Sequence, residues 1–506
     1  MQQSKFAHAA ERKAYSIVLK QIIKAGSSED REKNIDKLID MAEKLLKDTN
    51  PGAIRGLRAS LYPGSKWEEY LFRLIDETDP HVLQTVLLNG AYEASFRGIR
   101  QCTYNSDKYQ CNVPWIVLFD PTSACNKHCV GCWAADYENH LNLTYDELDS
   151  FVGQARDLGT YLFMLTGGEP LVRKKDVLKI ARKYNNCLFN IFTNASLVDE
   201  AFCKEVQELG NIVFSISVEG SEESNDARRG EGSYQEVMDA MDLLREHGLL
   251  FGTSTAYTRY NVDEVSSDEY LDNIINHGAR WAWYFHYMPV GAGAEADLMP
   301  TVEQREYMFH RLRDVRGNVG GKEIFAMDFQ NDGEFVQGCI AAGRNYCHVN
   351  ARGDVEPCVF IHYSNANIKE QTWLECLQQP LFQAYRKHYP WNDNMLQPCP
   401  MLENPEVLPQ IVHEADAHST EYVTPEGVDD LCARTTPYSE AWAPTAERLW
   451  LKDHPTGKKI YSDEMATAST AKKAAAIEDE FEAEKAQIDE MNLAADEAVK
   501  EFLDAE

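Results

Sequence analysis

The sequence lacks an excess of positive charge and any apolar run long enough to cross a bilayer. Its 506 residues carry 50 lysines and arginines against 81 aspartates and glutamates, a formal net charge of −31. Because a strongly negative surface repels phosphate groups, this balance argues against nucleic acid and anionic membranes as partners. The apolar stretch at residues 17–23 is too short and interrupted to span a membrane, and it fits a packed helix better than a surface-lying one. We therefore expect no transmembrane segment.

A secretory signal is also not apparent in the first residues. Without one, thirteen cysteines in a chain of this length do not indicate a disulfide framework. The hydrophobic content of 44% and the nine tryptophans indicate a globular chain with room for two or more domains. We expect a cytoplasmic protein whose cysteines take part in metal–sulfur ligation.

Three cysteines, and not four, are clustered as Cys125-x-x-x-Cys129-x-x-Cys132. A structural zinc site or a fully ligated iron–sulfur cluster needs four protein ligands. Three thiolates on a four-iron cluster leave one iron free to bind a small molecule. The alternatives are three buried thiols, or a zinc loop completed by a distant cysteine.

A glycine turn, Gly167-Gly168-Glu169-Pro170, follows at the end of the next predicted strand. Glycines let a backbone approach a ligand closely, and proline stiffens the chain after them. Alone, this tetrapeptide is a common turn, and only its occurrence together with the three cysteines makes it a specific signal of a ligand site.

Short apolar segments alternate with amphipathic ones between residues 113 and 287. We predict strands at 115–119, 161–165, 188–192, 212–217, 251–256 and 281–287, and helices at 144–158, 176–184, 199–208 and 234–247. Thr144 and Glu147 have the spacing of a capping box. This alternation predicts a parallel sheet with right-handed crossovers, whose ligands bind at the carboxyl ends of the strands, where the cysteine loop falls. Residues 6–98 are predicted to be helical, with one helix opening at Ser28.

The cysteine triplet together with Gly-Gly-Glu-Pro resembles the radical S-adenosylmethionine (radical SAM) superfamily. The resemblance implies a [4Fe–4S] cluster on Cys125, Cys129 and Cys132, whose fourth iron chelates SAM. One electron from it would yield methionine and a 5′-deoxyadenosyl radical that abstracts hydrogen from a substrate C–H bond. The resemblance also implies an α/β fold, a partial (β/α)6 TIM-like barrel over residues 113–320 that follows an N-terminal helical region, 1–112. The family's usual aromatic residue before the third cysteine is here Gly131, with Trp133 just after it.

Further positions resemble the family's SAM contacts. Gly167, Gly168 and Glu169 would receive the SAM ammonium, Ser217 and Glu219 the ribose, and Arg229, favoured over Arg228, the carboxylate; Asn194 closes another strand beside them. Strand-end polar residues also cap helices, and two adjacent arginines also occur as a surface pair, so these alternatives stay open.

A second cysteine group resembles the opening half of a SPASM or twitch auxiliary-cluster domain, predicted over residues 321–445. A hairpin around residues 351–354 would bring Cys339 and Cys358 together, and Cys399 and Cys432 would complete a second [4Fe–4S] site. The SPASM closing half is not recognisable, so a twitch-like domain with one cluster is predicted. Cys347 and Cys376 are expected to be buried thiols. Residues 446–506 are predicted to form an acidic amphipathic helical tail, suited to docking or self-association.

The resemblance implies a radical SAM enzyme, an oxidoreductase or radical transferase, that needs a one-electron donor of the flavodoxin or ferredoxin type. A peptide or protein side chain is the predicted substrate. Radical modification of a lipid chain or a tetrapyrrole, and a non-catalytic iron–sulfur electron-transfer protein, are the alternatives. His286, in the aromatic segment 281–287, either lines the radical cavity or packs in the core.

Overall fold

The computed structural model describes residues 5–28, 31, 39, 60–62, 64–134, 141–318, 320–423 and 425–454. The chain forms two compact units, residues 15–447 and, separately, 1–14 with 448–506. Most of the helix predicted to open at Ser28 and all of the apolar stripe predicted for the tail lie outside the described residues. The predicted division into four domains stays a prediction.

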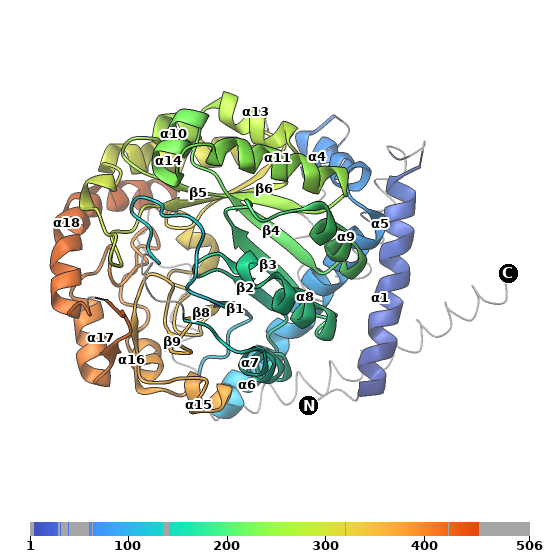
Figure 1. Ribbon diagram of the computed structural model, residues 1–506. Helices are drawn as coiled ribbons and strands as arrows, with labels where there is room; N and C mark the ends of the chain where they lie inside the picture. Colours follow the sequence, from blue (N-terminus) through green and yellow to red (C-terminus); the bar gives the residue numbers. More distant parts are fainter. Residues whose placement is uncertain are drawn as a thin grey trace. The chain divides into compact units, whose positions relative to one another are not determined.

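A nine-stranded sheet lies at the centre of the larger unit, with helices outside it (Figure 1). The strand order is β7-β6-β5-β4-β3-β2-β1-β8-β9, and every neighbouring pair except β8–β9 is parallel. The strands are β1 (Ile116–Phe119), β2 (Leu162–Leu165), β3 (Leu188–Thr193), β4 (Ile212–Ser217), β5 (Phe251–Tyr257), β6 (Trp281–His286), β7 (Phe325–Asp328), β8 (Tyr346–Val349) and β9 (Val355–Glu356). A separate antiparallel pair joins β10 (Tyr363–Ser364) and β11 (His418–Ser419).

Helices follow most strands of the parallel part, as right-handed βα units require. They are η2 (Pro170–Arg173), α7 (Tyr145–Leu158), α8 (Lys174–Lys183), α9 (Glu200–Leu209), α10 (Glu222–Arg229), α11 (Ser233–Glu246), α12 (Val262–Val265), α13 (Asp268–Asn276), η3 (Ala296–Leu298) and α14 (Val302–Arg316). The predicted capping box opens α7: the N–H of Glu147 donates to Thr144 Oγ1 at 3.2 Å, and the N–H of Thr144 donates to Glu147 Oε2 at 2.7 Å.

The chain before β1 is helical where it is described. It contains α1 (Lys5–Gly26), α4 (Lys66–Asp76), α5 (Pro80–Leu87), a π-helix η1 (Leu88–Gly98) and α6 (Ile99–Tyr109). After β9 come α15 (Trp373–Leu377), α16 (Pro380–His388), α17 (Val407–Ala415) and α18 (Val428–Asp453), and η4 (Gly333–Val336) precedes β8. In the described part of the chain, no helix is both long and apolar enough for a membrane span.

The sheet is wider than the six predicted strands, because β7 joins one edge and the β8–β9 hairpin joins the other. The hairpin predicted around residues 351–354 is confirmed: His348 pairs with Glu356 and Val349 with Val355. Because β8 pairs in parallel with β1, the segment of the second cysteine group is built onto the same sheet as the first cysteine loop.

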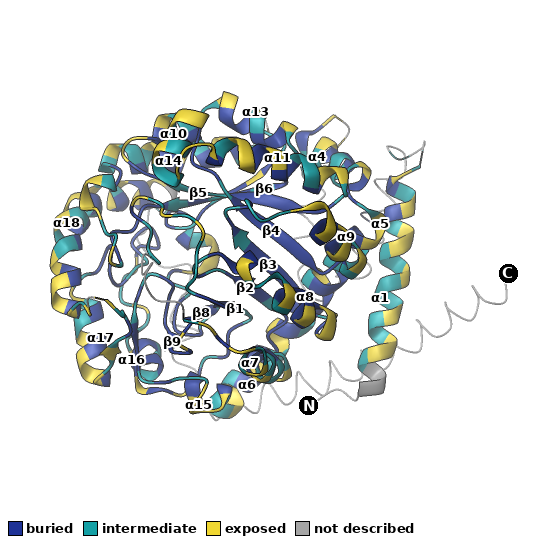
Figure 2. Cartoon of the chain, in the orientation of Figure 1, coloured by how far each residue is buried: buried dark blue, intermediate teal, exposed yellow. Residues whose placement is uncertain are grey.

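The strands are the most buried part of the unit (Figure 2). Phe119, Phe151 and Phe163 pack edge to face between the sheet and α7, with ring centroids 5.6 to 6.4 Å apart. On β6 burial alternates along the strand, with Trp281, Trp283 and Phe285 only partly buried. The residues of β6 that alternate with these three are buried. Tyr284 is one of them, and it donates its hydroxyl to the carbonyl of Val265 at 2.8 Å. The core thus fixes which β6 side chains face the barrel interior.

Candidate active site

The cysteine loop and the glycine turn meet through their backbones. The N–H groups of Gly168 and Glu169 donate to the carbonyls of Thr122 and Ala124, at 3.0 and 2.8 Å. A Cβ on Gly168 would lie 2.2 Å from the Ala124 carbonyl oxygen, and Gly167 has a φ of +105°. The sequence predicted that these glycines admit a ligand, but the close approach in the structure is to the cysteine loop itself. Only glycine fits there.

The three thiols of the triplet lie together on this loop, each partly buried. Burial raises the pKa of Cys125 to about 11, with Glu169, Cys132 and Cys129 adding to the rise, so the three groups are close enough to interact electrostatically. No three histidine, cysteine or acidic side chains of the described residues are arranged to hold a single metal ion. Whether the triplet can hold an iron–sulfur cluster is therefore judged from the path of the cysteine loop and from the side chains that contact it.

Glu169 spans the ends of β2 and β3. Its buried carboxylate accepts hydrogen bonds from Thr193 Oγ1 at 2.7 Å, from the N–H of Asn194 at 2.8 Å and from the N–H of Leu171 at 3.0 Å. Burial raises its pKa, and these donors oppose the rise. The carboxylate thus holds two strand ends in place, and the ammonium contact predicted from the sequence stays a prediction.

Arg229, at the end of α10, links the cysteine loop to Glu219. Its Nη2 and Nε lie 2.5 and 3.0 Å from Glu219 Oε1, and its Nη1 lies 4.0 Å from Cys129 Sγ. Burial alone would lower the pKa of this guanidinium, but Glu219 and the thiols of Cys129 and Cys132 raise it above its ordinary value. The N–H of Val130 donates to the carbonyl of Arg228 at 2.9 Å, which fastens the loop to the helix end.

Glu219 retains one buried oxygen without a partner. Arg228 and Arg229 both donate to its Oε1, whereas its Oε2 is buried and accepts no hydrogen bond. A buried acceptor left unpaired costs free energy, and a ligand donor such as a hydroxyl would satisfy it. This orphaned atom fits a polar ligand at the position where the resemblance places the ribose.

A cavity of about 200 Å³ occupies the barrel interior beside Gly131, Arg228 and Arg229, and Glu219 is not among its lining residues. Ser217, Thr166 and Arg229 line its polar end, and Phe192, Trp283 and Phe285 its aromatic wall. Asn194 is not among the lining residues: its side chain donates to Asn126 and accepts from Ser196. His286 does line the cavity, as one sequence alternative proposed, and its Nε2 lies 2.7 Å from the Tyr438 hydroxyl.

The Tyr287 side chain explains why residue 131 is a glycine. A Cβ on Gly131 would lie 2.8 Å from the Tyr287 hydroxyl oxygen and 2.7 Å from Leu298 Cδ1. The aromatic ring missing from the cysteine loop is therefore supplied by the end of β6, and Trp133 lines the same cavity. Tyr287 belongs to the aromatic segment that the sequence analysis placed either in the cavity wall or in the core, and it lines the cavity. Its contact with Gly131 was not predicted, because Gly131 and Tyr287 lie far apart in the chain.

Three of the four cysteines assigned to the auxiliary site line a second cavity, of about 590 Å³. They are Cys339, Cys358 and Cys399, whereas Cys432, on α18, is not among the lining residues. The Tyr385 hydroxyl is buried without a partner. Burial is the main cause that raises its pKa, and the nearby thiols of all four cysteines add to the rise. Tyr346 donates its hydroxyl to Cys358 Sγ at 2.7 Å. Cys339, Cys358, Cys399 and the orphaned hydroxyl fit an iron–sulfur group, whereas Cys432 lies outside the cavity lining. Cys347 and Cys376 are buried, as expected.

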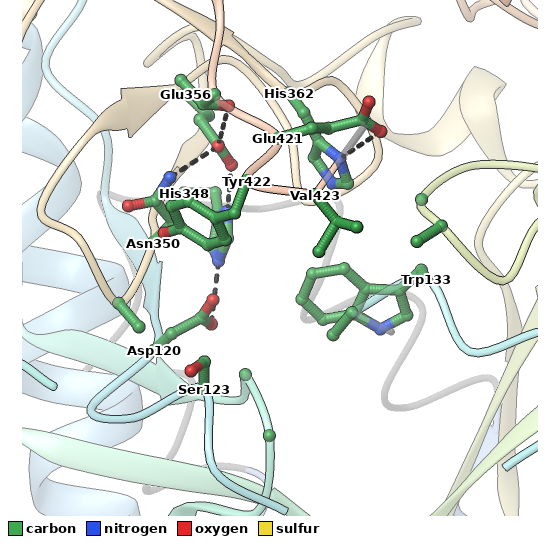
Figure 3. A pocket seen from close by; sticks show the side chains of 17 residues that line it. Asp120, Ser123, Trp133, His348, Asn350, Glu356, His362, Glu421, Tyr422 and Val423 are labelled. Atoms are coloured by element: carbon green, nitrogen blue, oxygen red, sulfur yellow. Dashed lines mark hydrogen bonds and ion pairs between the residues drawn. The ribbon is translucent and has the colours of Figure 1, made fainter. Parts of the chain in front are cut away.

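A small polar pocket lies on the other side of Trp133 (Figure 3). His348 lies between two buried carboxylates, with Nε2 2.9 Å from Asp120 Oδ1 and Nδ1 2.6 Å from Glu356 Oε2. Asp120 follows β1 and Glu356 lies on β9, so this imidazole connects the cysteine loop to the hairpin that leads to Cys358. Sequence reasoning did not identify the triad, although an acidic residue directly after the first strand was a usable signal.

Comparisons with known proteins agree with this geometry. Residues 119–274 match the model of the radical SAM superfamily, and residues 339–401 match the SPASM iron–sulfur cluster-binding domain. The chain therefore contains a radical SAM domain followed by a SPASM domain. It is a radical SAM enzyme with a SPASM-type auxiliary domain, and the fold and the SAM and [4Fe–4S] cofactors expected from the resemblance are confirmed. The SPASM match includes Cys399 and ends before Cys432.

Individual relatives are distant. An AdoMet-dependent heme synthase of Methanosarcina barkeri is 25% identical over 291 residues, which are 52% of this chain and 82% of that protein. The mycofactocin maturase MftC of Mycolicibacterium smegmatis is 26% identical over 262 residues, 49% of this chain and 65% of that one. Among solved structures, SuiB of Streptococcus suis bound to S-adenosylmethionine has a TM-score of 0.49 at 16% identity, covering 71% of this chain and 84% of its own.

Replacing Gly168 by alanine should displace the cysteine loop. The added Cβ would lie 2.2 Å from a carbonyl oxygen that belongs to backbone, so the loop must move, at a cost of roughly 1–3 kcal/mol. We expect less iron per chain after anaerobic reconstitution. Gly427→Ala, whose Cβ would have its nearest neighbour at 3.3 Å, is the matched control. Equal iron content in both variants would contradict the role given to Gly168.

His348 should make stability depend on pH in the alkaline range. Burial alone would lower its pKa, but Asp120 and Glu356 raise it from 6.5 to about 10. Its stabilising contribution is therefore complete below about pH 6.5 and is lost as the pH rises through about 10. We expect the melting temperature to fall more between pH 7 and 10 in the wild type than in His348→Gln, with exposed His413→Gln as control. Parallel curves would refute the charged pairing.

Proposed function

We propose that the protein cleaves SAM reductively at the first cysteine loop and abstracts a hydrogen atom from a substrate held in the barrel cavity. The observation that carries this proposal is that the cysteine loop contacts both the glycine turn and the Arg229–Glu219 pair, and that Arg229 and Gly131 of the loop line one cavity. When bound, the [4Fe–4S] cluster supplies the electron that splits SAM into methionine and the hydrogen-abstracting 5′-deoxyadenosyl radical.

In this proposal Cys125, Cys129 and Cys132 hold the cluster, and Gly167 and Gly168 fix the loop that carries them. Glu169 positions the end of β3, where Asn194 lies, and its carboxylate would accept from the ligand ammonium. Arg229 offers the cluster thiolates a neighbouring positive charge and the SAM carboxylate a donor.

Glu219 Oε2 and Ser217 then accept from the ribose hydroxyls. The partnerless oxygen of Glu219 supports that assignment, because it lacks a donor within the protein. The aromatic wall made by Phe192, Trp283 and Phe285 excludes water from the reacting carbon.

Cys339, Cys358 and Cys399 hold the auxiliary cluster in this proposal, with Cys432 as the assigned fourth ligand. The barrel cavity and the auxiliary cavity share Tyr346 and Phe360, so a substrate radical would form beside an electron acceptor. A flavodoxin or ferredoxin is the proposed electron donor, and the cytoplasm the proposed location.

The relatives offer two substrate classes. Mycofactocin maturase and the sporulation killing factor maturation protein SkfB of Bacillus subtilis support the predicted peptide or protein side chain. The heme synthases favour a tetrapyrrole side chain as second candidate. Incubating reduced, cluster-replete protein with SAM and assaying 5′-deoxyadenosine tests the reaction whatever the substrate; absence of cleavage would favour the non-catalytic electron-transfer alternative.

The two cysteine groups should have separable roles. We expect Cys129→Ala to abolish SAM cleavage and Cys358→Ala to retain part of it while forming no product. The buried thiol Cys203 lies on α9 and lines neither cavity, and Cys203→Ala should leave both readouts near the wild-type values. Liquid chromatography of 5′-deoxyadenosine with mass spectrometry of the substrate measures both steps. Equal loss in the first two variants would contradict the separation.

Glu219→Gln should weaken SAM binding. The change removes the charge that holds Arg228 and Arg229, and hydrogen bonds to charged groups contribute roughly 1.5–3 kcal/mol. We expect the dissociation constant for SAM to rise by about tenfold or more, measured by equilibrium dialysis. Glu222→Gln, in the first turn of α10, is the matched control. An unchanged constant would remove Glu219 from the site.

A further inference from the structure

The Tyr346 hydroxyl has a defined position beside one of the auxiliary cysteines. Its oxygen accepts a hydrogen bond from the N–H of Val359 at 3.0 Å, and the hydroxyl donates to Cys358 Sγ at 2.7 Å. Because the N–H occupies one lone pair of the oxygen, the hydroxyl hydrogen is directed to the sulfur. The tyrosine backbone is itself held in the sheet, where Tyr346 of β8 pairs with Ile116 of β1.

The sulfur and the group that holds the hydroxyl belong to one short segment. Val359 directly follows Cys358 in the chain, so its N–H and the cysteine side chain are carried by adjacent residues. The carbonyl of Cys358 accepts from the N–H of Ile361 at 3.0 Å, which closes this segment as a tight turn. We therefore expect the hydroxyl to stay within reach of the sulfur when Cys358 binds iron.

The contact from Tyr346 differs in kind from the hydrogen bond to another assigned cysteine. In the part of the chain that the structure describes, Cys399 Sγ accepts from the backbone N–H of Leu402 at 3.4 Å. A backbone N–H is present whatever the side chain of its residue, whereas the hydroxyl depends on residue 346 being a tyrosine. A substitution at this position can therefore remove one hydrogen bond to a cysteine and leave the backbone donors in place.

The surroundings of this hydroxyl are apolar and buried. Tyr346 and Cys358 are 6% and 9% exposed, and Phe329, Ile340 and Phe360 line the same cavity. An added electron makes an iron–sulfur cluster more negative, and an apolar site disfavours that charge. A hydrogen bond to a ligand sulfur stabilises the added charge, because hydrogen bonds to charged acceptors are the stronger ones. The hydroxyl should therefore favour the reduced form of a cluster held by Cys358.

We propose that Tyr346 is a positioning residue that raises the reduction potential of the auxiliary cluster through its hydrogen bond to Cys358. This inference rests on the proposed function, which assigns Cys358 as a ligand of that cluster. Tyr346 also lines the barrel cavity, so the residue that adjusts the potential borders the proposed substrate site as well. A higher potential makes the auxiliary cluster a stronger one-electron oxidant.

The test is the midpoint potential of the auxiliary cluster, measured by anaerobic redox titration with detection by electron paramagnetic resonance. The full-length chain carrying Cys125→Ala, Cys129→Ala and Cys132→Ala is the background, so that only the auxiliary signal is read. Tyr346→Phe keeps the ring and removes the hydroxyl. We expect it to lower the equilibrium constant of reduction about tenfold, which is about 59 mV for one electron. An unchanged or higher potential would overturn the proposal.

Tyr284→Phe, in the same background, is the matched control. Tyr284 is buried and lines the same cavity, but it donates its hydroxyl to the carbonyl of Val265 and not to a cysteine. This variant also loses one buried hydrogen bond, and it should leave the potential unchanged. Equal shifts in Tyr284→Phe and Tyr346→Phe would mean that altered packing, and not the contact with Cys358, changes the potential, and the proposal would fall.

A change of opposite sign tests the same contact without removing it. Replacing Tyr346 by 3-fluorotyrosine keeps the hydroxyl and makes it a stronger donor, so the potential should rise above that of the parent chain. This measurement decides the matter if Tyr346→Phe assembles no cluster. A potential that falls or does not change with the stronger donor would contradict the proposal.

Cys358→Ala in the same background separates this inference from the ligand assignment. Loss of the auxiliary signal in Cys358→Ala, together with an unchanged potential in Tyr346→Phe, would contradict the inference alone. An auxiliary signal and iron content that survive Cys358→Ala would contradict both the ligand assignment and the inference. A potential shift in Tyr346→Phe, with no 5′-deoxyadenosine formed by the wild type, would contradict the proposed reaction and leave the role of Tyr346 standing.

Discussion

The contact between two backbones, those of the glycine turn and the cysteine loop, determines the rest of the site. A thiolate loop cannot hold an inorganic cluster unless its own path is fixed, and here that path is fixed by carbonyls that accept from Gly168 and Glu169. The same glutamate then reaches β3, and the loop is fastened to α10 through Val130. Three strand ends and one helix end are thus arranged around a single loop before any ligand contributes.

The second cysteine group gains its position from the same sheet. Because β8 lies beside β1, the auxiliary cysteines face the open side of the barrel and share walls with its interior. Tyr346 contributes to both sites: it lines both cavities, and its hydroxyl donates to Cys358 Sγ. Hydrogen bonds to cluster sulfurs are one of the means by which a protein sets a reduction potential.

Local patterns predicted most of the parallel sheet, because each βα unit has its own periodicity and caps. The strand at 212–217 and the capping box of Thr144 were given correctly by the residues alone. Strand β7 and the pairing of β8 with β1 were not, since the partners of that pairing are far apart in the chain and such short strands give little periodicity. The cysteine triplet could be recognised because its residues are neighbours in the chain, whereas Tyr287 against Gly131 and the His348 triad depend on contacts between distant segments.

The pairing of β1 with β8 also sets an order of events during synthesis. The ribosome releases β1 and its cysteine loop long before β8, so in the nascent chain β1 is an edge strand with unpaired backbone groups on one side. Asp120 likewise emerges without its imidazole partner. The sheet beside the loop that is to receive iron is therefore complete only after the β8–β9 hairpin has been made, and the half-finished sheet needs protection until then.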